Sequence, residues 1–165
     1  MRTPIAVSVA AISGAAAVFG AGALASGGSG AQSAAQVAGE NRTLFAVLSG
    51  RKEVDDEGHR GAGDRNGRGS FSATVDGDQL CFGLTVKNLD MPGAAHIHRG
   101  GKRRNGPIVV PLEHPGNGDP GAAGGCVTVD EDTLAAILRR PGRFYVNVHT
   151  AAFGGGAVRG NLFRR

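Results

Sequence analysis

Residues 70–89 read SFSATVDGDQLCFGLTVKNL and contain the clearest β-hairpin signal in the chain. Asp76-Gly77-Asp78 has the composition of a tight turn and separates two segments, 70–75 and 79–89, in which side-chain character alternates. One face of the second segment is apolar and consists of Leu80, Phe82, Leu84 and Val86. Cys81 points to the opposite face. We therefore expect two antiparallel strands with one buried face each.

Short segments on both sides of this hairpin alternate with turns rich in Gly, Asp and Pro. The expected strands outside the hairpin are 43–49, 94–98, 108–112, 126–129, 143–150 and 157–163. Asp130 is a suitable N-cap for one short helix, which Pro141-Gly142 ends after about Arg140. The pattern predicts an all-β fold, an antiparallel Greek-key β-sandwich or barrel with one short helix.

The first 25 residues have the features of a cleavable signal peptide. Arg2 precedes an apolar stretch that ends in Ala23-Leu24-Ala25, a small-x-small peptidase pattern, so we expect cleavage after Ala25 and a secreted product. The alternative is an uncleaved membrane anchor, although Ala and Gly dominate the stretch. Residues 26–40 predict a disordered spacer, and residues 41–165 predict one domain. We expect no membrane association after cleavage.

Two cysteines, Cys81 and Cys126, follow the signal segment. In an exported chain such a pair favours a structural disulfide. Zinc ligation by the pair is the weaker alternative, because the spacing is not that of a thiolate zinc site.

The chain carries a net charge of +4, and a basic run, Arg99 with 102–104, lies in a Gly-rich segment without aromatic residues. Nucleic-acid binding surfaces usually interleave basic and stacking aromatic side chains. We therefore expect no nucleic-acid partner and interpret the run as solvated surface.

The histidines are the most chemically specific feature of the sequence. His96-Ile97-His98 places two imidazoles on one face of a strand, and His149 lies opposite the apolar face of the later strand 143–150. Three imidazoles from two neighbouring strands would suit copper or zinc. The alternative is a set of surface or hydrogen-bonded histidines, because a His-x-His pair is a weak motif.

At these residues the sequence resembles the CHRD (chordin-type) domain family of exported proteins. The similar segments are Phe45–Gly50 with Glu53-Val54, Ala94–His98, Asn105–Val110, Phe144–Thr150 and Gly156–Leu162. The resemblance covers about residues 43 to 163. It implies an immunoglobulin-like or superoxide-dismutase-like sandwich or barrel and no established activity.

The limited likeness to copper/zinc superoxide dismutase implies particular roles. His96, His98 and His149 correspond to copper ligands, and Arg159 resembles the arginine that guides the anionic substrate. The zinc-binding loop of the dismutase has no counterpart here. The corresponding interval contains one histidine, His114, in the Gly/Pro-rich stretch 114–125, and no cluster of His and Asp surrounds it. Dismutase-type zinc binding is therefore not expected.

Two functions follow from these observations. The first is a non-catalytic extracellular binding or structural module, for which we expect no enzymatic activity. Its partner would be an extracellular protein or a component of the cell envelope. The alternative is a copper-binding, superoxide-dismutase-like protein that uses the three histidines. The positions of the three ring nitrogens discriminate between them, because a metal site needs these atoms within about 4 Å of one another.

Overall fold

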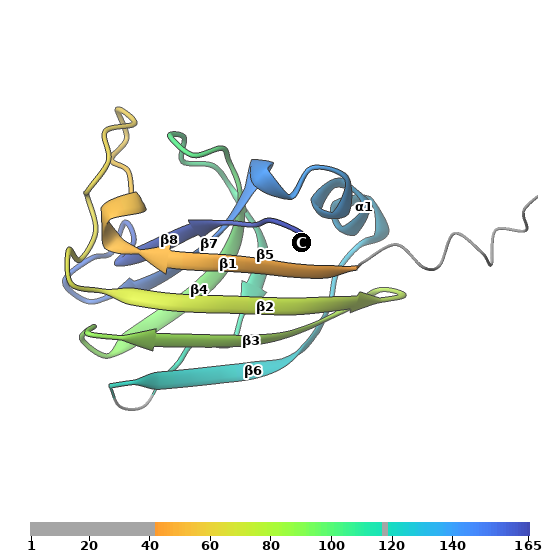
Figure 1. Ribbon diagram of the computed structural model, residues 1–165, viewed down its shortest axis with the longest axis horizontal. Helices are drawn as coiled ribbons and strands as arrows, with labels where there is room; N and C mark the ends of the chain where they lie inside the picture. Colours follow the sequence, from red (N-terminus) through yellow and green to blue (C-terminus); the bar gives the residue numbers. More distant parts are fainter. Residues whose placement is uncertain (1–41, 117–118) are drawn as a thin grey trace, which may run out of the picture. The chain divides into compact units, whose positions relative to one another are not determined.

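A computed structural model describes residues 42–116 and 119–165 of the chain (Figure 1). The expected signal peptide (1–25) and spacer (26–40) lie outside these residues and stay predictions. Within the described residues, no helix has the length and apolar character needed to cross a membrane.

The described part consists of eight strands, one α-helix and two short 3-10 helices. They are, in chain order, β1 (Thr43–Ser49), η2 (Gly50–Lys52), β2 (Arg68–Asp76), β3 (Gln79–Lys87), β4 (Pro92–Arg99), β5 (Ile108–Leu112), β6 (Gly121–Thr128), α1 (Glu131–Arg139), η3 (Pro141–Arg143), β7 (Phe144–Thr150) and β8 (Val158–Asn161). Every strand expected from the sequence is present. The largest difference from the expected bounds is in β6, which begins at Gly121 instead of Cys126. The Gly-rich first half of this strand shows no alternation in the sequence, but its backbone pairs with β3.

The strands form one sheet in the order β5-β4-β7-β8-β1-β2-β3-β6, and every pairing is antiparallel. In Figure 1, β4, β5 and β7 run behind β1, β2, β3 and β6, so the sheet curls on itself into a nearly closed barrel. The edge strands are β5 and β6. The all-β, antiparallel prediction is confirmed, with the barrel as the form that the sheet takes.

The core fills the inside of the curled sheet. Leu80, Leu84 and Ile97 are fully buried there, and the rings of Phe71 and Phe82 stack with their centroids 6.0 Å apart. The helix α1 adds Leu134 and Ile137 to this core. Its N-cap is Asp130, as expected, whose carboxylate accepts a hydrogen bond of 2.8 Å from the Thr133 amide.

The expected disulfide joins Cys81 of β3 to Cys126 of the edge strand β6. The two cysteines are direct register partners on the outer face of the sheet. Only Gly121 of β6 is buried, so this strand contributes little to the core. The disulfide therefore fastens an edge strand that has few apolar contacts of its own.

The outer face of β4 and β7 is covered, unlike the outer face of β2 and β3. Five consecutive residues of β7, Phe144 to Val148, are buried, so both faces of this strand lie inside the protein. Three loops contact the second face: the segments 53–63, 99–107 and 151–157. This covered outer face contains the histidines.

Candidate functional site

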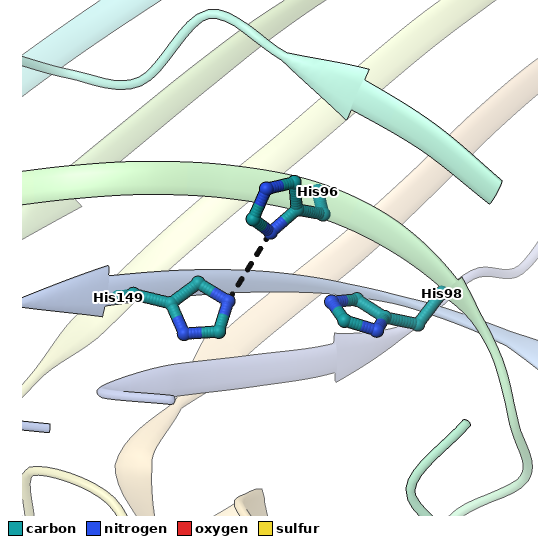
Figure 2. A group of neighbouring side chains, drawn as sticks. All are labelled: His96, His98 and His149. Atoms are coloured by element: carbon teal, nitrogen blue, oxygen red, sulfur yellow. Dashed lines mark hydrogen bonds between the residues drawn. The ribbon is translucent and has the colours of Figure 1, made fainter. Parts of the chain in front are cut away.

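The three histidines lie on adjacent antiparallel strands, as the sequence predicted. β4 pairs with β7 in a register that sets Ala94 opposite His149 and His96 opposite Asn147. Ile97 of β4 and its partner Val146 are fully buried in the core, so the flanking histidines of β4 point to the outer face. His149 is diagonal to His96 across the strand pair, which brings all three rings together (Figure 2).

One nitrogen of each ring faces a common region between the three side chains (Figure 2). His96 Nδ1 lies 3.2 Å from His149 Nε2, and one ligand atom of each histidine lies within 4.8 Å of those of the other two. The first pair meets the expected separation of about 4 Å, and the bound of 4.8 Å applies to the His98 nitrogen as well. The residue types and the separations are compatible with one metal ion after a small closing movement.

The outward nitrogens of two rings are held by backbone carbonyls. His98 Nδ1 donates to the Gly106 carbonyl at 3.0 Å, and His149 Nδ1 donates to the Gly154 carbonyl at 2.9 Å. A carbonyl only accepts, so the proton of each neutral ring is on Nδ1 and each Nε2 carries a lone pair. Such carbonyl contacts are what orients metal-binding imidazoles in proteins.

Among the described residues, His98 Nε2 is one of four buried side-chain atoms without a hydrogen-bond partner, with His114 Nδ1, Asn147 Oδ1 and Arg159 Nε, and it is the one that faces the other histidines. The side chain of His98 is only 8% exposed, and its Nε2 is buried without a hydrogen-bond partner among the described residues. Since His149 Nε2 has a lone pair, the proton in its 3.2 Å contact belongs to His96 Nδ1. The arrangement satisfies two of the three inward nitrogens and leaves the third as an unpaired acceptor.

Burial and mutual repulsion favour the neutral forms of His96 and His98. Desolvation, followed by the charges of the neighbouring histidines, lowers the pKa of His96 below its ordinary value of 6.5. Desolvation is also the main cause that lowers the pKa of His98, against the opposing effect of its hydrogen bond to Gly106. Neutral imidazoles are the form that binds a metal ion.

These shifts predict that the metal-free protein loses stability in mild acid. The unfolded chain takes up protons near pH 6.5, before the folded histidines do, so the free energy of unfolding falls as pH decreases from 6.5 through the lower pKa values of the folded state. Urea unfolding at a series of pH values measures this slope. A His96→Asn/His98→Asn variant should show a flatter profile, and identical profiles for the two proteins would contradict the expectation.

Arg159 does not lie at an open surface. Its side chain is 1% exposed, and its guanidinium carbon lies 3.4 Å from the ring centroid of Tyr145. Its nitrogens donate to the Asn105 side chain at 2.9 Å and to two carbonyls of the 99–107 loop, those of Gly101 at 2.6 Å and Arg104 at 2.8 Å. This placement favours a structural role and does not favour the anion-guiding role expected from the dismutase likeness.

A buried polar network, not predicted from the sequence, connects Arg159 with the histidines. Glu53 is 1% exposed; its carboxylate lies 3.6 Å from the Arg159 guanidinium and accepts a 2.7 Å hydrogen bond from Asn147. Tyr145 lies between Arg159 and His98, with its ring parallel to that of His98 at 4.8 Å. We define Glu53, Tyr145, Asn147 and Arg159 as the polar hub.

The sequence indicated which residues of β7 belong to the polar hub's face of the sheet, but not that this face is buried. Alternation along 143–150 placed Tyr145 and Asn147 on the same face as His149, which is correct. Nothing local indicated that this face is buried, or that Glu53 packs against it. Gly156 is one sign of close packing: its φ is 137°, and a Cβ there would clash with the Glu53 carboxylate and the Asn147 amide.

A second group of potential metal ligands lies on the surface. His59 Nδ1 lies 3.1 Å from the Asp55 carboxylate, and Glu57 is close to both. The side chains of His59 and Asp55 are 78% and 39% exposed, which is typical of a solvated ion pair. The surface group therefore lacks the enclosed, carbonyl-oriented geometry of the three histidines.

A family model described as the CHRD domain matches residues 44–162. No curated protein and no solved structure matches the chain. The three histidines, the polar hub and both cysteines all lie within the matched range.

Proposed function

The chain belongs to the CHRD domain family, and from that premise we propose that it is an exported, non-catalytic binding module whose ligand is one copper ion held by His96, His98 and His149. The signal-peptide pattern and the disulfide support the export part of this proposal. The metal part rests on the three histidines.

The observation that carries the proposal is the lone pair of His98 Nε2. It is buried and unpaired among the described residues, and it faces the inward nitrogens of the two other rings. A buried acceptor without a partner costs roughly 1–3 kcal/mol. Binding of a metal ion by the three inward nitrogens requires the proton of His96 to be on Nε2 instead of Nδ1, because a protonated nitrogen has no lone pair to donate. The bound ion would remove the cost at His98 and would leave one coordination position open.

Copper is favoured over other divalent ions by the ligand set. Three imidazoles without a carboxylate or thiolate suit both zinc and copper, and copper binds such sites more tightly. Catalysis is not part of the proposal, because the guanidinium of Arg159 is enclosed and stacks on Tyr145 instead of facing a solute.

Copper titration followed by calorimetry tests this function. We expect one ion per chain, and an affinity that decreases by at least about 100-fold in His98→Ala, because loss of an outer partner alone typically costs 10–100-fold. His149→Gln is a second variant at a less buried position and should show a similar loss.

His59→Ala provides the matched control, since it removes an exposed imidazole outside the cluster. It should bind copper like the wild type. Equal, weak binding by the wild type, His98→Ala and His149→Gln would instead assign the histidines to a purely structural, hydrogen-bonded cluster.

A further inference from the structure

A second candidate site lies at the end of the barrel that holds α1, separate from the histidines. A hollow of about 430 Å³ is lined by residues of the β4–β5 loop, η3 and α1. Three arginines line it, Arg99, Arg104 and Arg143. The apolar part of its lining includes Pro107, Ala136 and Phe144. It thus combines positive charge with a small apolar surface.

The backbone that carries these arginines is fixed by the fold. Arg99 ends β4 opposite Phe144 of β7, and the Gly100 amide donates to the Arg143 carbonyl at 2.7 Å. The Arg104 carbonyl accepts from the buried guanidinium of Arg159 at 2.8 Å. Two segments, the 99–107 loop and η3, are therefore held around one hollow by strand pairing and by the polar hub.

The three side chains are exposed and not neutralised. None of them forms an ion pair with a carboxylate in the ranges 42–116 and 119–165. Arg99 has its guanidinium carbon 5.8 Å from the centre of the Phe144 ring, which keeps it beside the hollow. The pKa of Asp130 is lowered mainly by its hydrogen bond with Thr133 and to a smaller extent by the charge of Arg99, with which it forms no ion pair.

The surrounding sequence strengthens the positive potential. The segments 99–107 and 139–143 contain no Asp or Glu. Their basic residues are Arg99, Lys102, Arg103, Arg104, Arg139, Arg140 and Arg143. Like charges brought together around a concave surface raise the local concentration of anions.

We propose that this hollow binds the phosphoryl group of a phosphorylated small molecule. Guanidinium groups bind phosphate through paired hydrogen bonds, and several arginines around one point match its two negative charges. The volume lies within the usual range for small-molecule sites and exceeds what a phosphate ion alone requires. The ligand class is a phosphomonoester with a sugar-sized body that lies against the exposed Pro107.

Calorimetry of the wild type at low ionic strength tests the site with glucose 6-phosphate, glucose, inorganic phosphate and sulfate as probes. We expect glucose 6-phosphate to bind more tightly than inorganic phosphate, and glucose not to bind. Vesicles of phosphatidylcholine with and without phosphatidic acid, whose headgroup is a phosphomonoester, test whether the phosphoryl group belongs to a lipid instead.

Variants that each remove one positive charge, inside or outside the hollow, distinguish binding in the hollow from general electrostatic attraction to the basic surface. Arg143→Gln and Arg99→Gln should each weaken binding by about tenfold or more, the usual effect of losing a charge-assisted hydrogen bond. Arg103→Gln and Lys102→Gln remove the same charge from the same loop outside the hollow, and should change affinity by less than about threefold. All four side chains are exposed, so thermal unfolding should show intact folding.

The results distinguish a soluble ligand from a lipid headgroup, and they show whether the hollow binds a phosphoryl group at all. Tighter binding of glucose 6-phosphate than of vesicles identifies a soluble ligand. Vesicle binding that Arg143→Gln and Arg99→Gln weaken, but Arg103→Gln and Lys102→Gln do not, identifies a lipid headgroup. Equal weakening in all four variants, or no binding of glucose 6-phosphate and of vesicles by the wild type, would overturn the site. Copper binding is unaffected in either case, so this test is independent of the metal proposal.

Discussion

Replacement of Arg159 by methionine is expected to lower the free energy of unfolding by about 3–5 kcal/mol, the usual cost of removing one partner of a buried ion pair. The variant loses the hydrogen bonds to Asn105, Gly101 and Arg104 and the contact with the Tyr145 ring. It also leaves the carboxylate of Glu53 buried opposite an apolar side chain. Urea unfolding of the two proteins measures the difference.

Two further variants make this result specific. Arg159→Lys keeps the positive charge but not the planar fork that reaches three acceptors, so we expect an intermediate loss of stability. Arg99→Met removes an exposed arginine that also lies over an aromatic ring and should change stability by less than about 0.5 kcal/mol. A loss in Arg159→Met no larger than that in Arg99→Met would refute the central role of this side chain.

Arg159 also connects the polar hub, on which the stability of the fold depends, with the histidine His98. The 99–107 loop that it holds supplies the Gly106 carbonyl to His98, and Tyr145 separates its guanidinium from the His98 ring. The polar hub therefore helps to orient His98 Nε2, through contacts on the side of the ring opposite to the other two histidines. This is the role that outer residues have around metal-binding imidazoles.

Removal of the disulfide is expected to cost up to about 4 kcal/mol, because the bond closes a segment of 45 residues in the unfolded chain. The suitable variant is Cys81→Ser/Cys126→Ser. Both positions are at least partly exposed, so serine introduces no buried polar group. Urea unfolding in the absence of reductant gives the change in stability.

The loss should be accompanied by local opening of β6. Among the residues that the structure describes, this strand pairs only with β3, and only its Gly121 is buried, so the disulfide is its main attachment besides the backbone hydrogen bonds. Amide exchange in β6 should become faster in the double variant, with little change in β4 and β7. A stability loss below about 1 kcal/mol, with unchanged exchange in β6, would contradict this interpretation.

The strand pattern was predictable because alternation and turns are local properties. Leu80, Phe82 and Leu84 alternate along β3 and are buried as expected, and the turn at Gly77 connects β2 to β3 in register. β6 was only partly predictable, since its Gly-rich half gives no alternation and its partner β3 supplies the hydrogen bonds. The curled sheet depends on pairings between distant strands, such as β8 with β1 through Ser49 and Arg159.

The sequence by itself determined which side chains share a face of the sheet, including His96, His98 and His149, since side-chain direction alternates with every residue of a strand. It did not determine what covers that face. Only the tertiary structure brings Glu53 and Asn105 to Arg159, across more than 50 residues of chain, and so converts an apparently exposed face into a buried polar network. The physical reason is that burial of the second face depends on the packing of loops, for which the sequence contains no periodic signal.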